Sequence, residues 1–197
     1  ADLRTCGGGG IVRLSRRGRG VRHLCGLLRA LHIENLAGAC GDRVAVFPAG
    51  RRKADTRFAP DLPLDRAMVA TIVHRIAGAP DAAGTNMPFR DVPAGAYYAQ
   101  PVLWAYHAGV VSGCGADTFC PTQAISRQDL TVILYRYACL AGVADAAQSE
   151  NVLSGFADAG AVSDYARAAL AWAVENGIVY GRDNHCIDPQ GTATRAE

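Results

Sequence analysis

The chain lacks long apolar runs, is poor in aromatic residues and contains no recognised metal-binding or nucleophile motif. No stretch of about 18 apolar residues occurs, so no segment is expected to span a membrane. Aromatic residues make up only 7% of the 197 positions. Neither Cys-x-x-Cys nor His-Glu-x-x-His is present, so no metal site and no cofactor are expected. A hydrophobic content of 50%, rich in Ala and Gly, favours closely packed helices with short turns.

The seven cysteines allow two interpretations. An odd number of widely spaced cysteines is typical of small buried hydrophobic side chains. Cys114 and Cys120 flank one short loop, however, and favourable geometry would let them form a local disulfide. The sequence leaves both interpretations open.

Charge divides the chain into two parts. Residues 1–53 carry eleven Lys and Arg against three acids, whereas residues 54–197 carry nine bases and fifteen acids. A division this sharp indicates that the two parts differ in role or origin. Gly7 to Gly10 and the arginines between 13 and 22 interrupt any apolar segment, so no signal peptide is predicted and an export signal would lie outside this chain.

Short motifs recur in a fixed order, which predicts a repeat protein. A Phe-x-Pro-like motif occurs three times, at Phe58-Ala59-Pro60, Phe119-Cys120-Pro121 and Ile187-Asp188-Pro189. Each copy is followed by a cap-like residue and an arginine, as Asp65-Arg66, Ser126-Arg127 and Thr194-Arg195. The segments before the second and third copies also match, pairing Phe89-Arg90-Asp91 with Phe156-Ala157-Asp158, Trp104 with Trp172, and Gly113 with Gly181.

Apolar spacing predicts two kinds of helix in each unit. After Ser126 the stripe Leu130, Ile133, Leu134, Tyr137 and Ala138 predicts a helix with one buried face, and an equivalent stripe follows Asp65. A second helix is expected over residues 100–108, with a counterpart over 165–176. Glycines mark the expected helix ends, at Gly78, Gly109, Gly142 and Gly177. One such helix pair can bury its apolar face only against neighbouring units.

The order and spacing of these motifs resemble the S-layer homology family. Residues 88–142 are similar to a complete repeat, residues 155–197 to a repeat without its last helix, and residues 57–80 to the second half of an earlier repeat. The resemblance implies an all-α fold of tandem helix-loop-helix repeats in a pseudo-threefold arrangement, with the first and third repeats incomplete. It also implies grooves between repeats that bind secondary cell-wall polysaccharide, often pyruvylated.

Residues 1–56 form a basic region that does not match the family. We consider a frame-shifted reading of the gene, a disordered segment, and a nucleic-acid-binding segment as its explanations. Residues 13–29 are basic, which suits a phosphate backbone, but aromatic side chains for base stacking are absent there.

The arginine at the opening of each repeated helix is the leading candidate for ligand contact. A helix N-terminus carries partial positive charge, so Arg66, Arg127 and Arg195 indicate a negative partner nearby. That partner is the carboxylate of a pyruvylated sugar, an acid of the same fold such as Asp91 or Asp158, or both at once.

The other candidate polysaccharide-binding residues also have structural interpretations. Ser126, Thr194 and Glu197 fit helix capping, with sugar contact as an additional role. Trp104 and Trp172 could stack on sugar rings, although a repeated Trp on an amphipathic helix is more often a core residue. Tyr98 stands at a helix start, where exposure is easier.

We therefore expect a non-catalytic module that anchors a secreted bacterial protein to cell-wall polysaccharide at the extracellular surface. The alternative is the anchor fragment of an extracellular enzyme such as a glycan hydrolase, with catalysis elsewhere. His107, His185, Cys114 and Cys186 have no metal-site spacing and are not shared between the copies, so catalysis by this chain is not expected.

Overall fold

The computed structural model describes residues 59–82, 84, 86–144 and 149–196. Within these ranges the chain forms four α-helices, α3 (Arg66–Ile76), α4 (Ala99–His107), α5 (Arg127–Leu140) and α6 (Asp164–Glu175). Short 3-10 segments complete the second half, at η2 (Glu150–Gly155), η3 (Ala159–Ala161) and η4 (Asp183–His185). The only pairings between extended segments here are isolated bridges, so the all-α class is confirmed. The hypotheses on residues 1–56 and on Glu197 concern positions outside the described residues.

The helices begin and end where the sequence predicts. The Asp65 carboxylate caps α3 by accepting a hydrogen bond from the Met68 N–H at 2.7 Å. The Ser126 hydroxyl caps α5 in the same way, accepting from the Asp129 N–H at 3.1 Å. Just beyond each C-terminus a glycine adopts positive φ, a conformation that costs glycine little, at Gly78, Gly109, Gly142 and Gly177.

A closed ring of backbone hydrogen bonds joins the three repeats. The Leu64 N–H donates to the Ala193 carbonyl at 2.9 Å, Ile125 N–H to the Leu64 carbonyl at 2.9 Å, and Ala193 N–H to the Ile125 carbonyl at 3.0 Å. These residues occupy the same position in their repeats, and all three are buried. The cyclic pattern confirms the pseudo-threefold arrangement, because each repeat donates to one neighbour and accepts from the other.

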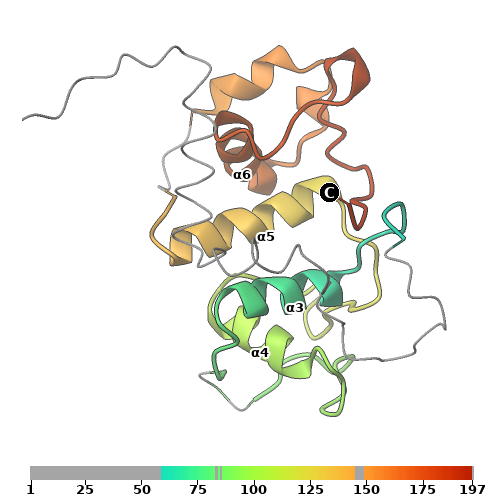
Figure 1. The fold of residues 1–197 in the computed structure, drawn as a ribbon, viewed down its shortest axis with the longest axis vertical. Helices are drawn as coiled ribbons and strands as arrows, with labels where there is room; N and C mark the ends of the chain where they lie inside the picture. The colour runs from blue at the N-terminus through green and yellow to red at the C-terminus, as the bar shows by residue number, and fades with distance from the viewer. Residues whose placement is uncertain (1–58, 83, 85, 145–148, 197) are drawn as a thin grey trace, which may run out of the picture.

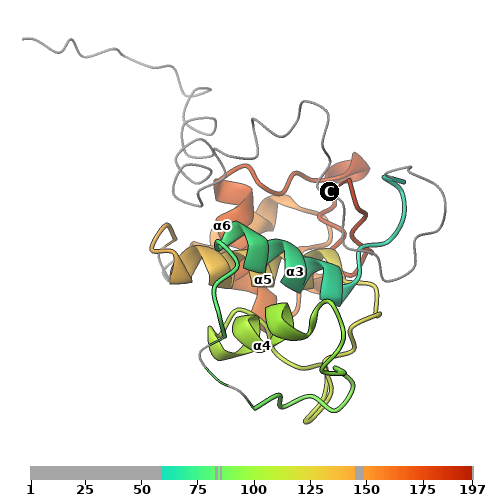
Figure 2. The same ribbon diagram turned by 60° about the horizontal axis from the view of Figure 1, so that its bottom comes forward.

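Helix α5 lies at the centre of the molecule, with α6 on one side and α3 and α4 on the other (Figures 1 and 2). Its Ile133 and Tyr137 pack into the core shared with α3 and α4, while Val132 packs into the core beneath α6. The predicted single buried face is therefore wrong for α5, which buries two faces. The reason is tertiary, because α5 packs against α3 and α4 on one side and against α6 on the other.

Candidate functional site

The second and third repeats each contain an aspartate that holds the loop leading into the proline of the Phe-x-Pro-like motif. The Asp91 carboxylate accepts hydrogen bonds from the Phe119 and Cys120 N–H groups at 2.8 and 2.7 Å. Asp158 accepts from Ile187 and Asp188 at the same two distances. Each carboxylate thus satisfies two backbone donors of its own repeat, and it fixes where the neighbouring carbonyls point.

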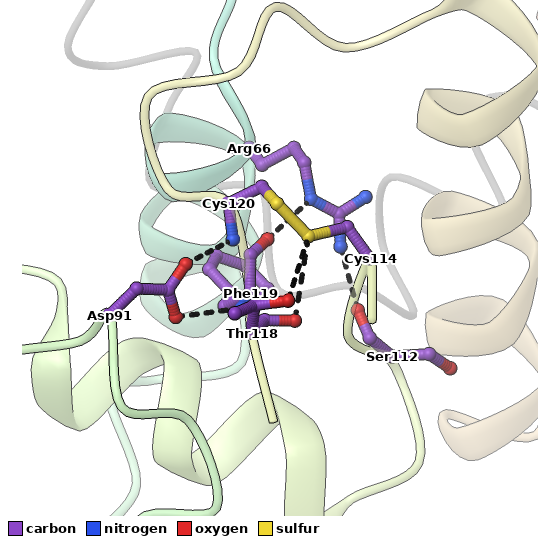
Figure 3. The surroundings of a disulfide bond; sticks show 7 residues. All are labelled: Arg66, Asp91, Ser112, Cys114, Thr118, Phe119 and Cys120. Carbon is purple, nitrogen blue, oxygen red and sulfur yellow. Dashed lines mark hydrogen bonds between the residues drawn. A yellow bond between two sulfur atoms is a disulfide. The ribbon is translucent and has the colours of Figure 1, made fainter. Parts of the chain in front are cut away.

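Those carbonyls hold the arginine of the preceding repeat. Arg66 Nε donates to the Phe119 carbonyl at 2.9 Å, and its Nη2 donates to the Ser112 carbonyl at 2.6 Å (Figure 3). The guanidinium carbon also lies 4.9 Å from the centre of the Phe119 ring, in cation–π range. The arginine at the first turn of α3 therefore reaches across the boundary between two repeats.

Arg127 repeats this arrangement one unit further along the chain. Its Nε donates to the Ile187 carbonyl at 3.0 Å, and its Nη2 lies 3.5 Å from the Tyr180 carbonyl. Ile187 and Tyr180 are the counterparts of Phe119 and Ser112. The structure thus brings each arginine to the loop of the next repeat, a relation that the motif spacing within one repeat did not reveal.

The alternative partners proposed for these arginines, Asp91 and Asp158, have another role. Their carboxylates accept hydrogen bonds from backbone N–H groups, as described above, and the hydrogen bonds of the Arg66 guanidinium go to carbonyls. Burial lowers the pKa of the Arg66 guanidinium, while Asp129, Asp91 and Tyr165 oppose that shift. Arg66 is thus a partly desolvated cation whose direct hydrogen-bond partners are neutral.

Arg195 is the corresponding arginine of the third repeat. Its N–H donates to the Leu62 carbonyl at 2.9 Å, which ties the third repeat to the first. Its side chain is half-buried and close enough to Asp65 to favour the charged carboxylate. Burial is the larger influence and raises the pKa of Asp65.

A first groove of about 320 Å³ opens where α3, α5 and the loop of the second repeat meet. We define it by its lining residues, which are Arg66, Ser112, Gly113, Cys114, Gln123, Asp129, Val132, Ile133, Arg136 and Tyr165. Arg136 Nη1 donates to the Ser112 hydroxyl at 2.9 Å, so two arginines meet at one side of this groove. Tyr165 donates to Asp129 Oδ1 at 2.7 Å.

Gln128 fixes the position of Tyr165. Its amide nitrogen donates to the Tyr165 hydroxyl at 2.8 Å and contacts the Ser163 hydroxyl at 3.1 Å, while its oxygen accepts from the Ser163 N–H. Burial raises the pKa of the Tyr165 phenol, and the hydrogen bond to Asp129 raises it further. The phenol is therefore a neutral donor at ordinary pH, held between α5 and α6.

A second groove of about 350 Å³ occupies the equivalent boundary between the second and third repeats. Its lining residues are Arg127, Leu130, Thr131, Leu134, Ile178, Val179, Tyr180, Gly181, Arg182 and Ala193. Four of them, Arg127, Tyr180, Gly181 and Arg182, correspond to Arg66, Ser112, Gly113 and Cys114 of the first groove. The second groove is more apolar, because leucine, isoleucine and valine side chains replace much of the polar lining.

The remaining sequence candidates lie apart from the groove linings. Trp104 and Trp172 are buried in the core, with 9% and 2% of their surface exposed, so neither indole offers an open face for a sugar. Tyr98 is half-buried and packs edge-on against Tyr97. Ser126 and Thr194 line neither groove. Trp104 and Trp172 are accordingly core residues, the second of the two interpretations given above.

Several groove residues were missed at the sequence level. Arg136, Tyr165, Tyr180 and Arg182 line the grooves, yet none belongs to a motif common to all copies. Aligning the second and third repeats would have found Tyr180 and Arg182, because both are adjacent to the shared Gly181.

Gly113 and Gly181 have a packing role. A Cβ at Gly113 would stand 2.6 Å from the Thr118 carbonyl and 2.9 Å from the Phe89 ring. At Gly181 it would stand 2.8 Å from the Phe156 ring. Both glycines therefore let the Phe of Phe-x-Asp pack directly against the loop.

Cys114 and Cys120 form a disulfide within this same loop, with their Cα atoms 6.1 Å apart (Figure 3). Of the two interpretations that the sequence left open, the local disulfide is the one found. Cys139 and Cys186 are free and half-buried.

Among the described residues, no helix is long and apolar enough to cross a membrane, and no cluster of three or more His, Cys, Asp or Glu is suited to a metal ion.

The fold and grooves define a threefold helical repeat module with arginine-bordered clefts between its units. The family model of the S-layer homology domain matches residues 88–131 and 155–197 of the sequence. The chain therefore carries two S-layer homology repeats.

Three curated relatives share this region. The chain is 34% identical to an amylopullulanase of Thermoanaerobacterium thermosulfurigenes over 145 residues, 32% to exoglucanase XynX of Acetivibrio thermocellus over 145, and 29% to the surface-layer 125 kDa protein of Lysinibacillus sphaericus over 147. Each match covers 73% of this chain but only 8%, 13% and 12% of the respective relative. The similarity is therefore to the cell-surface anchoring region that a surface-layer protein shares with two enzymes.

Proposed function

We propose that the two grooves bind an anionic cell-wall polysaccharide and that the module thereby holds a secreted bacterial protein at the cell wall. The observation that carries this proposal is the repeated arginine at the edge of each groove, held by carbonyls of the next repeat. Volumes of about 320 and 350 Å³ lie at the lower end of the range of small-molecule sites, which suits a short stretch of sugar.

The electrostatics of Arg66 favour a carboxylate ligand. Two of its five N–H groups bind the Phe119 and Ser112 carbonyls, which orients the guanidinium but leaves its charge without a directly bonded anion. A carboxylate bound in the first groove would offset the desolvation that lowers the pKa of Arg66. A pyruvyl ketal on a sugar supplies such a carboxylate.

The positions of the side chains indicate which of them would contact the polysaccharide. Arg66 and Arg127 line the two grooves, with Arg195 as their counterpart on the third repeat. Arg136 and Tyr165 add donors to the first groove, and Tyr180 adds an aromatic face to the second, where 74% of its surface is exposed.

Sedimentation with purified cell-wall sacculi tests the proposal. We expect the wild-type chain to sediment, and mild-acid removal of pyruvyl groups to abolish this. A variant with Arg66→Ala, Arg127→Ala and Arg195→Ala should stay in the supernatant while remaining helical by circular dichroism.

Arg90→Ala is the matched control, since Arg90 is an exposed arginine whose side chain pairs with Asp117 away from both grooves. It should sediment like wild type. Equal sedimentation of the triple variant and wild type would refute an arginine-based site.

A second candidate is that the module anchors an extracellular glycan-degrading enzyme. Two of the relatives favour it, because both are named as enzymes and the match covers only a small share of each. In that case catalysis resides outside this chain, and residues 1–197 alone should release no reducing sugar from starch, pullulan or cellulose. Measurable release would overturn the non-catalytic assignment.

A further inference from the structure

The groove-side loops of the second and third repeats are closed by different cross-links at corresponding positions. Cys114 and Cys120 form a disulfide in the second repeat. The residues 68 positions later, at 182 and 188, are Arg182 and Asp188, and Arg182 Nη1 lies 3.2 Å from Asp188 Oδ2. A covalent bond and an ion pair thus join the same two points of equivalent loops.

The backbone geometry supports this equivalence. Cys120 and Asp188 both have positive φ, 58° and 54°. The N–H of each donates to the carboxylate of its own repeat's aspartate at 2.7 Å, Asp91 for Cys120 and Asp158 for Asp188. The two cross-links therefore hold loops of one shape.

Each cross-linked loop also borders a groove and holds that groove's arginine. Gly113 and Cys114 line the first groove, and Gly181 and Arg182 line the second. The first loop presents two carbonyls to Arg66, that of Phe119 inside the disulfide-linked segment and that of Ser112 two residues before it (Figure 3). Opening the cross-link would remove one restraint on this loop, leaving the hydrogen bonds to Asp91, and would loosen the carbonyls that orient the guanidinium.

The two cross-links respond to different agents. The Arg182 and Asp188 side chains are 47% and 39% exposed, so salt screens their attraction and a thiol does not affect it. The disulfide is indifferent to salt, and thiol–disulfide exchange cleaves it.

We propose that the Cys114–Cys120 disulfide is a redox control on the first groove and that its reduction weakens glycan capture by this groove alone. The inference rests on the proposed function of the grooves. A dithiol is the reductant. Its thiolate attacks one protein sulfur, which forms a mixed disulfide and releases the other cysteine. Its second thiol then attacks, so two electrons and two protons pass to Cys114 and Cys120 while the dithiol becomes a cyclic disulfide.

The test measures the sacculi concentration for half-maximal binding of the full chain, with and without dithiothreitol. In an Arg127→Ala background, where capture depends on the first groove, reduction should raise this concentration about three- to tenfold, as expected when a preorganised loop becomes mobile. In an Arg66→Ala background, where capture depends on the second groove, it should not change.

Two variants in the Arg127→Ala background separate this loop from the chain's other cysteines. The pair Cys114→Ser and Cys120→Ser should bind like the reduced chain and should not respond to dithiothreitol. The pair Cys114→Arg and Cys120→Asp transfers the cross-link of the third repeat, and its binding should also become independent of reductant.

The possible outcomes distinguish failure of the redox inference from failure of the proposed function. An unchanged half-maximal concentration on reduction of the Arg127→Ala chain would overturn the redox inference while leaving sacculi binding intact. Failure of the oxidised wild-type chain to bind sacculi would instead refute the proposed function, and this inference with it. Faster amide hydrogen exchange in residues 112–120 after reduction supports the mechanism, and unchanged exchange there contradicts it.

Discussion

Removal of the Asp91 carboxylate should damage the second repeat without removing apolar surface. In Asp91→Ala, the Phe119 and Cys120 N–H groups lose the acceptors that now lie 2.8 and 2.7 Å away. Phe119 is fully buried, so water reaches the first of these donors poorly. The loop that holds Arg66 would then lack the anchor that fixes its carbonyls.

The size of the effect follows from the two bonds. A hydrogen bond to a charged group contributes about 1.5–3 kcal/mol, and Asp91 is half-exposed, so we take the lower value for each and expect a loss of about 3 kcal/mol. Asp91→Asn keeps one acceptor oxygen and should lose about 2 kcal/mol. With a urea dependence of about 1–3 kcal/mol per molar, the Asp91→Ala midpoint should fall by roughly 1–3 M.

Urea unfolding followed by circular dichroism at pH 7 measures these shifts. Asp117→Ala is the control in the same loop, because its pair with Arg90 is exposed and worth at most about 0.5 kcal/mol. If Asp91→Ala and Asp117→Ala lower the midpoint equally, the assignment of Asp91 as the loop anchor is refuted.

Three further predictions use the same unfolding assay. Gly113→Ala should cost about 1–3 kcal/mol, because its Cβ would overlap the Thr118 carbonyl, whereas Gly95→Ala, with open space around it, should be neutral; equal effects would contradict the packing role. Asp65 has a raised pKa, so the folded state binds its proton more tightly than the unfolded state and this group's contribution to stability falls as pH rises from the ordinary value of 3.8 through the higher folded value. Asp65→Asn should therefore gain stability relative to wild type across that range, and a constant difference would refute the sign. Trp172→Ala should lose about 3–5 kcal/mol; if it instead stays fully stable yet loses sacculi binding, its assignment to the core is wrong.

The helices were largely predictable because their signals are local. The helices expected over 100–108 and 165–176 are found at Ala99–His107 and Asp164–Glu175. Positive-φ glycines end them, and Asp65 and Ser126 cap the other two helices. Each of these signals acts within one or two helical turns, so no tertiary information was needed to read it.

The second buried face of α5 was not predictable from its own sequence stripe. Val132 packs under α6, while Ile133, its neighbour in the chain, packs on the opposite core. Which apolar positions are buried depends on how many repeats surround a helix. That number follows from the closure of the ring through Leu64, Ile125 and Ala193.

The sequence singled out the two arginines that line the grooves, Arg66 and Arg127, but neither their partners nor the lining residues Arg136, Tyr165, Tyr180 and Arg182. Arg66 and Arg127 were singled out because a positive charge is unfavourable at a helix N-terminus. The sequence suggested acidic side chains of the same chain as their internal partners. For Arg66 the structure shows carbonyls of the next repeat as the direct hydrogen-bond partners, while Asp91 and Asp158 accept hydrogen bonds from backbone donors. Such contacts join residues 53 and 60 positions apart, beyond the reach of any local pattern.

The groove is consequently a property of neighbouring repeats and not of a single one. Arg66 belongs to the first repeat, but the loop that orients it belongs to the second. Arg127 belongs to the second repeat, and its loop belongs to the third. A peptide of residues 88–142 would keep Asp91 and its loop but would lose Arg66 from the first groove and the Ile187 carbonyl from the second. We therefore expect such a peptide not to sediment with sacculi even where its helices form, and sedimentation at wild-type affinity would show that one repeat suffices.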